Sequence, residues 1–486
     1  MKKRFIIILC VVSMLIAPVL GCQQNAPAAT TTQAGTTAAA ATTAATEATT
    51  AAASAEEQIQ LSFWHRGSGT GGYTLTFVTP MFEKDRPNVK VDDQMMGNDY
   101  ADALRLALAA DSAPDLFEVG TGLGFMTVTA SAEAGYIQPL TPLLNDEELD
   151  LANKIDPPLI NLSKIMYNDE YYSFPLYKAF YVMLINHDLF AKAGLDPASP
   201  PATFEEVAVA AKQISDVGNG EFYGFGLHLG QNNILYRVID MMEGVTSGAG
   251  LYGFNYNTTR FDFAPHKPYL ELLVQMKKDG SILPGEATTD VEQMRSKFNQ
   301  GVVGMYIDGS WATGVYDATD MQNDFEWSFA HMPALNNNNP RNVGYAYYNN
   351  EFCVYSKTKY PELSMEYYKY LLRNSLIQAT EYANGPVSYT KDPVEAANAE
   401  YKYNGEKLKW LNEATTDYAP YSIEPNTIIT LTGDNRDIVL NEALVNAFAG
   451  DNIDFDRLLD DLTKRYNEAL DIALSEGKIK QEELYR

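Results

Sequence analysis

The chain contains 486 residues, of which 46% are hydrophobic and 20% are charged. This length is too great for one ordinary core, and the composition is that of a soluble globular protein, which excludes a disordered chain and a polytopic membrane protein. The net charge of −27 disfavours nucleic acid and anionic ligands as partners.

The N-terminus departs from this composition. Residues 2–4 are basic and precede an apolar run over residues 5–20, which predicts a signal peptide over residues 1–21. Its Leu-Gly-Cys ending resembles a bacterial lipobox, so we expect lipidation at Cys22 and a protein anchored to the extracellular face of the cell membrane. An ordinary secretory signal with a chance cysteine is the alternative. Residues 22–57 are rich in Ala and Thr and predict a flexible linker.

From residue 58 onward, strand and helix patterns alternate, which predicts an α/β fold. The first strand starts at Ile59 and ends near residue 64, and further strands are expected near residues 89–91 and over residues 115–119. A helix is expected over residues 100–110, because Leu residues there recur one turn apart.

Helix boundaries are marked further along the chain. Residues 203–206 and 289–292 both fit a capping box, with Thr203 and Thr289 as the capping residues. Gly280 is expected to follow the end of one helix, and Pro361 to open another. The C-terminal stretch over residues 441–486 reads as helical, with an apolar stripe that we interpret as a core face.

Motifs for catalysis and cofactors are weak. The five histidines are scattered without zinc-site spacing, and the acidic run at residues 451–457 has no EF-hand spacing. It is better explained as the N-terminal end of a helix. Cys353 is expected to be an inert core residue. We therefore expect no metal, no cofactor and no catalysis.

Aromatic residues near predicted loops suit a neutral polar ligand that has an apolar face, such as a sugar. Trp311 stands out, because it follows a strand over residues 302–307 and the turn residues Asp308 and Gly309. Loops at the carboxyl edge of an α/β sheet gather ligands, so Trp311 is expected to face a ligand. Packing of these aromatics in a core is the alternative. The ligand-binding candidates are Trp64, His65, Tyr73, Glu118, Tyr177, Asp308, Trp311, Tyr345 and Tyr347.

Several stretches together resemble the extracellular solute-binding proteins of ABC importers, in the family 1 group that mostly serves carbohydrates. They include LSFWHRGSG at residues 61–69, APDLFEVG at residues 113–120 and FNQGVVGMYIDGSWA at residues 298–312. The resemblance runs from about Ile59 to the C-terminus. Residues 389–425 match no pattern of the family.

The resemblance implies a two-lobe periplasmic-binding-protein-like α/β fold with a hinge and a central ligand cleft. It also implies a protein without catalysis that captures a carbohydrate and delivers it to ABC transporter permease subunits. We expect a monomer that contacts the membrane through its N-terminal lipid and binds no nucleic acid. The expected segments are a signal peptide at 1–21, a lipidated cysteine and linker at 22–57, lobe 1 at 58–173 and 309–374, lobe 2 at 174–308, and a C-terminal helical segment mainly of lobe 2 at 375–486.

Two alternatives remain open at this point. An exported glycoside-active enzyme would need a pair of carboxylates in a cleft, and 63 acidic residues make any guessed pair uninformative. A non-transport binding lipoprotein, such as a sensor partner or an adhesin, would share the signal peptide and the binding fold.

Overall fold

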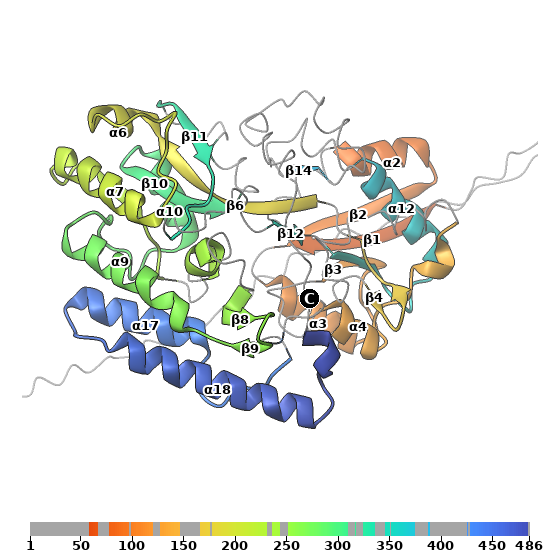
Figure 1. Cartoon of the computed structure of the whole chain (residues 1–486). Helices are drawn as coiled ribbons and strands as arrows, with labels where there is room; N and C mark the ends of the chain where they lie inside the picture. The colour runs from red at the N-terminus through yellow and green to blue at the C-terminus, as the bar shows by residue number, and fades with distance from the viewer. Residues whose placement is uncertain are drawn as a thin grey trace, which may run out of the picture. The chain divides into compact units, whose positions relative to one another are not determined.

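The computed structural model is shown in Figure 1. The signal peptide and the linker, expected at residues 1–57, lie outside the described residues. The structure describes residues 58–66, 77–96, 99–119, 127–145, 166–174, 177–230, 236–243, 251–309, 316, 324–335, 346–349, 351–374, 387–388, 425 and 428–484.

A first sheet has the strand order β13-β3-β1-β2. β1 pairs in parallel with both β2 and β3, whereas β13 runs antiparallel to β3. Apolar residues alternate along β1, as expected, with Leu61 and Phe63 fully buried. The strands are β1 (Ile59–Arg66), β2 (Val89–Met96), β3 (Leu116–Val119) and β13 (Glu351–Val354).

Helices cover both faces of this sheet. Phe82 and Tyr367 pack on the face that carries Phe63, and Tyr100 and Leu104 pack on the face that carries Phe117. The sheet is therefore the middle layer of an α/β arrangement. The elements are α2 (Thr79–Asp85) and α12 (Pro361–Arg373) on one face, α3 (Tyr100–Ala109) and α4 (Val128–Glu133) on the other, and the short η2 (Thr141–Leu143), β4 (Met166–Tyr167) and β5 (Glu170–Tyr171).

A second sheet has the order β11-β6-β10-β7, and β12 and β14 pair with the opposite end of β6. Side chains along β6 alternate between two cores: Met183 belongs to one and Leu184 to the other. The strands are β6 (Tyr177–Asn186), β7 (Tyr223–Gly226), β10 (Val303–Gly309), β11 (Trp327–Ala330), β12 (Ala346–Asn349) and β14 (Val387–Ser388).

The helices on the second sheet pack closely. A Cβ atom added at Gly224 in β7 would lie 2.1 Å from the backbone oxygen of Ala211, so glycine lets helix α7 approach the strand. The helices are α6 (His187–Lys192), α7 (Phe204–Gly218), α9 (Lys267–Lys278) and α10 (Val291–Asn299). The shorter helical segments are η5 (Tyr236–Asp240), η6 (Leu251–Gly253) and η7 (Ala264–His266), and the two short strands are β8 (Phe254–Asn255) and β9 (Arg260–Phe261).

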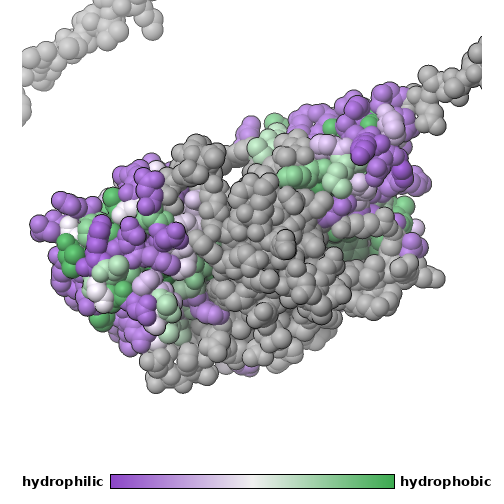
Figure 2. Space-filling view, turned by 90° about the horizontal axis from the view of Figure 1, so that it is seen from above, coloured by the Kyte–Doolittle hydropathy of each residue, from purple (hydrophilic) through white to green (hydrophobic). Residues whose placement is uncertain are grey.

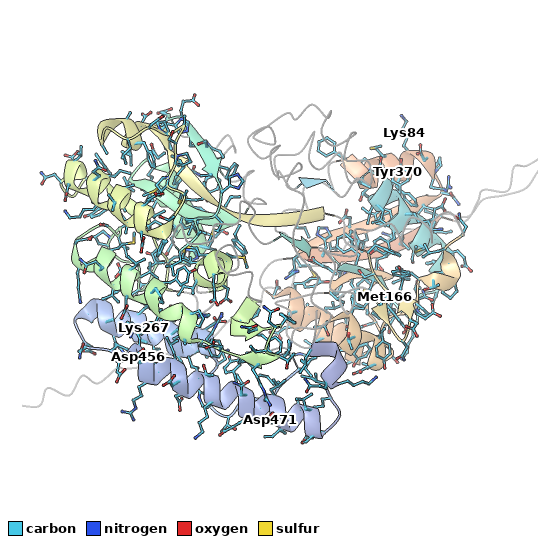
Figure 3. All side chains as sticks on the ribbon, viewed as in Figure 1. Lys84, Met166, Lys267, Tyr370, Asp456 and Asp471 are labelled. Atoms are coloured by element: carbon cyan, nitrogen blue, oxygen red, sulfur yellow. The ribbon has the colours of Figure 1, made fainter. Side chains whose placement is uncertain are left out.

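The C-terminal residues form two helices and a short turn: α17 (Arg436–Ala449), α18 (Phe455–Ser475) and η10 (Gln481–Leu484). Leu459, Leu462 and Leu470 are buried in the same core as α9, which confirms the predicted core face. Ion pairs join these helices to earlier segments. Lys267 pairs with Asp456, and both are labelled in Figure 3. Arg260 pairs with Asp471.

The two sheets are connected through the backbone at β12 and β13. β12 pairs with β6 in the second sheet, and β13, which begins two residues after β12 ends, pairs with β3 in the first. A passage between lobes had been expected near Gly309. The sheet pairing shows no passage at that point. The next strand, β11, still pairs with β6 in the second sheet.

Most local predictions are confirmed, and two need correction. Thr203 makes the predicted capping box with Glu206, Pro361 opens α12, and Asp454 from the acidic run caps α18. The second capping box is shifted by one residue: Asp290, not Thr289, caps α10, and its partner is Gln293. The Thr289 hydroxyl instead donates to the carbonyl of Gly285.

The second correction concerns Asp308, which was expected in the loop after the strand. The structure places both Asp308 and Gly309 within β10, where they pair with Val182 and Tyr181 of β6. Backbone pairing with β6 extends this strand beyond its apolar run. Cys353 is buried in β13, as predicted.

The surface shows few large apolar features among the described residues. Among the described residues on the face drawn in Figure 2, hydrophilic ones predominate and apolar ones form small patches. No described helix combines the length and the hydropathy needed to cross a membrane. The exposed large hydrophobic residues of the described part are spread over α2, β2, α3, α7 and α18: Met81, Met95, Leu106, Val209, Val217 and Ile472.

Candidate ligand-binding site

The first sheet has a topological switch point at the carboxyl ends of β1 and β3. After β1 the chain adds β2 on one side and later adds β3 on the other, with all three strands parallel. Connections that leave in opposite directions open a crevice at this edge, where α/β sheets bind ligands. Arg66 is the last residue of β1, and Glu118 lies one residue before the end of β3.

Arg66 and Glu118 are joined by three hydrogen bonds. Glu118 Oε1 accepts from Arg66 Nη2 at 2.7 Å and from Nε at 3.0 Å, and Oε2 accepts from the Arg66 backbone N–H at 2.8 Å. The Glu118 side chain is 2% exposed, whereas the Arg66 side chain is 25% exposed. The guanidinium is thus the accessible part of a charge pair whose carboxylate lies behind it.

His65 lies on the opposite face of β1 and is fully buried. Its Nε2 is 2.7 Å from Asp93 Oδ1, and its Nδ1 is 3.1 Å from the carbonyl oxygen of Arg66. Burial lowers the pKa of His65, but the hydrogen bond to Asp93 and the charge of that carboxylate outweigh burial and raise the pKa above its ordinary value. Both ring nitrogens face acceptors, which favours the imidazolium form.

The same network continues behind His65. The Thr79 hydroxyl donates to Asp93 Oδ2 at 2.7 Å and lies 2.7 Å from the hydroxyl of Tyr367 in α12. Residues of β1, β2, α2 and α12 are thereby tied together beneath the carboxyl edge. We therefore place His65, which had been expected among the ligand contacts, as a support for Arg66.

Trp64 and Tyr100 lie on the side of the first sheet opposite His65. Trp64 is half-buried and packs against the cluster that contains Tyr100. The Tyr100 hydroxyl donates to the Glu118 carbonyl oxygen at 2.6 Å and accepts from the Glu118 backbone N–H at 2.8 Å. These contacts fix the backbone at the end of β3. Trp64 remains the aromatic ligand-binding candidate that the structure describes at this edge.

Asp308 sits in a separate buried network on the second sheet. Its Oδ1 accepts from Arg295 Nη2 at 2.9 Å and its Oδ2 from Arg295 Nε at 2.7 Å. The hydroxyl of Tyr316 donates to Oδ2 at 2.6 Å. Burial lowers the pKa of Arg295, but the charge of Asp308 outweighs it and raises that pKa well above its ordinary value. Asp308 is 1% exposed, so its carboxylate serves the fold in this structure.

The remaining candidates are less fully described. Tyr177 and Tyr347 lie in the paired strands β6 and β12, where Tyr177 is the partner of Asn349. Tyr73, Trp311 and Tyr345 lie outside the described residues. Trp64, His65 and Glu118 are brought to one edge of the first sheet, and Asp308 belongs to the second sheet.

One group of potential metal ligands occurs among the described residues. Atoms of Asp240, Glu243 and His266 lie within 4.8 Å of one another, and all three residues are buried. Arg436 Nη1 donates to both Asp240 oxygens, at 2.6 and 2.7 Å, and lies 3.4 Å from His266 Nε2. The Arg436 guanidinium already pairs with Asp240, and His266 lies 2.9 Å from Glu243, so the group fits an internal ion network that fastens α17 rather than a metal site.

Comparison with known families decides what these two sheets represent. The model of a family described as bacterial extracellular solute-binding protein matches residues 66–375. The chain belongs to this family. The match includes Arg66, β3 and β13 of the first sheet, and β6, β7, β10, β11 and β12 of the second sheet.

Curated relatives of this solute-binding protein are distant. It is 26% identical over 235 residues to the sn-glycerol-3-phosphate-binding periplasmic protein UgpB of Yersinia pestis bv. Antiqua (strain Antiqua), which covers 46% of this chain and 50% of the relative. It is 24% identical over 299 residues to the protein of the same name from Agrobacterium fabrum, covering 58% of this chain and 63% of the relative. The chain spans about half the length of the first of these relatives.

Solved structures support the two-lobe α/β fold. An ABC transporter solute-binding protein from Thermotoga lettingae TMO, bound with alpha-D-tagatose, matches with a TM-score of 0.65 and 22% identity, covering 85% of this chain and 100% of that one. An ABC substrate-binding protein from Listeria monocytogenes, in complex with cycloalternan, matches with a TM-score of 0.62 and 19% identity, again covering 85% and 100%. At such identities the likeness shows the fold alone.

Sequence reasoning about this solute-binding protein missed Arg66. The sequence contained one signal for it, because Arg66 ends an alternating strand just before the glycine-rich stretch at residues 67–72. Its partner Glu118 was identified, but as a direct ligand contact. The pairing of these two residues depends on the parallel pairing of β1 and β3, which the sequence pattern does not specify.

Proposed function

We propose that this solute-binding protein captures a carbohydrate, either a mono- or an oligosaccharide, and delivers it to the permease of an ABC importer without chemical change. Membership of the solute-binding family over residues 66–375 is the observation that carries the proposal. In this mechanism the ligand contacts both lobes, so the closed form gains the larger contact energy and its population rises.

The geometry of the described edge supports a hydroxylated ligand. Arg66 presents a charged hydrogen-bond donor, and Trp64 presents an aromatic side chain on the same strand and the same face. Donors for hydroxyl oxygens beside an aromatic surface suit the polar and apolar sides of a sugar ring. Tyr73, Tyr177, Trp311, Tyr345 and Tyr347 remain proposed contacts, with Glu118 and His65 acting through Arg66.

We also propose the placement expected from the sequence, together with lobe boundaries that differ from the expected ones at the return to lobe 1. A lipid on Cys22 and a linker at residues 22–57 would hold the protein at the extracellular face of the cell membrane as a monomer. Lobe 1 would begin at residue 58 and lobe 2 near residue 174. The pairing of β13 with β3 supports a return to lobe 1 near residue 350, and the packing of α17 and α18 on α9 supports a C-terminal segment mainly of lobe 2.

A thermal-shift screen of the mature protein against a carbohydrate panel tests this function. We expect at least one neutral mono- or oligosaccharide to raise the melting temperature in a concentration-dependent way, because a ligand that binds only the folded state stabilises it. Release of new reducing ends from the same sugar would instead support an exported glycoside-active enzyme. Binding of a sugar by this protein, together with cellular uptake of that sugar that does not depend on an ABC permease, would favour a sensor partner or an adhesin.

A phosphorylated polyol is the second candidate ligand. The observation that favours it is the similarity to relatives from Yersinia pestis and Agrobacterium fabrum that are named sn-glycerol-3-phosphate-binding periplasmic proteins. The same screen therefore includes sn-glycerol 3-phosphate beside glycerol. A shift with the phosphate ester and none with any sugar would replace carbohydrate by phosphate ester in the proposal.

A further inference from the structure

The buried charge network around Asp308 lies at the carboxyl end of β10. β10 pairs in parallel with β7 as far as Tyr306, and Asp308 follows two residues later in the same strand. The carboxyl ends of parallel strands form the edge at which α/β sheets bind ligands. The network therefore occupies a position in the second sheet from which it can influence a ligand contact.

The Asp308 carboxylate is held from several directions. Arg295 of α10 donates to both oxygens, with Nε 2.7 Å from Oδ2 and Nη2 2.9 Å from Oδ1. The Tyr316 hydroxyl donates to Oδ2 at 2.6 Å, and the Gly309 backbone N–H donates to Oδ1 at 2.7 Å. These bonds match the roughly four lone-pair sites of a carboxylate, so the group is fixed in one orientation.

Two of these bonds anchor the residues that flank positions 310–315. Gly309 precedes this segment and Tyr316 follows it. Gly309 is bonded through its backbone and Tyr316 through its side chain, and both bonds end on the same carboxylate. The sequence of the segment includes Trp311, which is one of the proposed sugar contacts. Both ends of the segment are thus tied to Asp308.

Tyr316 is itself held firmly. It is 1% exposed, and its ring centroid lies 5.5 Å from that of Phe298 and 5.5 Å from that of Trp327. Aromatic packing on these neighbours fixes the ring independently of its hydroxyl. A hydroxyl that donates to a carboxylate makes a charge-assisted bond, which is stronger than a neutral one. The hydroxyl can therefore be removed without removing the packing.

We propose that Asp308 and Tyr316 are positioning residues for ligand binding, which act by holding both ends of the segment that carries Trp311. The inference rests on the proposed solute-binding function. A segment whose ends are fixed loses less conformational entropy when a ligand orders it, so the affinity is higher. Asp308 and Tyr316 are each 1% exposed, and they act through the segment rather than by contact with the sugar.

The substitution Tyr316→Phe in the mature protein tests this role, because Phe keeps the ring packing and lacks the hydroxyl. In calorimetric titration with the neutral sugar that gives the largest thermal shift, we expect the affinity to fall about fivefold or more. In a Trp311→Ala background the same substitution should change the affinity less than about twofold, since the positioned contact is gone. Equal losses in the two backgrounds would overturn the proposal.

Tyr466→Phe is the matched control. Tyr466 is also buried, and its hydroxyl accepts from the backbone N–H of Arg436 at 2.9 Å, where α18 packs on α17. The control should lower the melting temperature of the unliganded protein and change the sugar affinity less than about twofold. A loss of affinity in the control equal to that of Tyr316→Phe would overturn the proposal, because general loosening of the fold would explain both.

Arg295→Lys is a second variant of the network. Lys keeps a positive charge near the buried Asp308 carboxylate, but it cannot reproduce the two parallel bonds of the guanidinium. We expect a loss of affinity in the same direction as for Tyr316→Phe. Unchanged affinity in folded Tyr316→Phe and Arg295→Lys would overturn the inference and leave the proposed function standing. Absence of wild-type binding to every sugar of the panel would remove the proposed function together with this inference.

Discussion

His266 gives the structure a measurable dependence of stability on pH. Its imidazole is fully buried, with Nδ1 2.9 Å from Glu243 Oε2 and Nε2 3.2 Å from Asp240 Oδ1, and the Arg436 guanidinium lies beside Asp240. Burial lowers the pKa of His266, but the charges of Glu243 and Asp240 and the bonds to them outweigh burial. They raise the pKa from 6.5 to about 9.

The size and sign of the effect follow from linkage. Because the folded pKa is higher than the unfolded one, protonation of His266 stabilises the folded state. This contribution is fully present below pH 6.5, falls as the pH rises, and is lost above about pH 9. A shift of roughly 2.5 units at about 1.36 kcal/mol per unit corresponds to about 3 kcal/mol.

Urea unfolding at a series of pH values between about 6 and about 10 measures this term. We expect the free energy of unfolding of the wild type, minus that of His266→Gln, to decrease by about 3 kcal/mol across this range. His187→Gln serves as a control, since His187 is half-buried and its Nε2 lies 2.8 Å from the Ser328 hydroxyl. Parallel pH curves for the wild type and His266→Gln would refute the reasoning.

Four further outcomes are expected. Arg436→Met should lower the free energy of unfolding by about 3 to 5 kcal/mol, because it leaves the buried Asp240 carboxylate without its main partner. Chemical unfolding measures this change, and a loss below about 1 kcal/mol would contradict the prediction. Gly224→Ala should cost about 1 to 3 kcal/mol in the same assay, because its Cβ would meet the backbone of α7, and an unchanged midpoint would count against that contact. Trp311→Ala should weaken sugar binding by about 1 to 3 kcal/mol in calorimetry while the unliganded melting temperature changes little. Mass spectrometry of membrane-extracted protein should find a lipid on Cys22, and an unmodified N-terminus elsewhere would disprove the anchor.

Elements with a local cause could be predicted from the sequence. The alternation of Leu61 and Phe63 specifies a half-buried strand, and Thr203 with Glu206 caps a helix through contacts within one turn. Pro361 opens α12 because proline fits the first turn of a helix. These features depend on residues that are close in the chain.

The charge pairs could not be predicted in this way. Arg66 and Glu118 are 52 positions apart, and Arg436 and Asp240 are 196 positions apart, so each pair depends on strand order and helix packing. Asp308 illustrates the same limit. Its sequence context of Asp-Gly-Ser is typical of a loop, but pairing with β6 keeps it in a strand and Arg295 holds it in the interior.

Calorimetric titration of the mature protein with the neutral sugar that gives the largest thermal shift tests the central claim most directly. We expect saturable binding of one sugar per chain and recovery of that sugar intact by chromatography afterwards. Trp64→Ala should weaken the binding, since Trp64 is the described aromatic at the Arg66 edge. No heat of binding with any neutral sugar, together with tight binding of sn-glycerol 3-phosphate, would contradict the account.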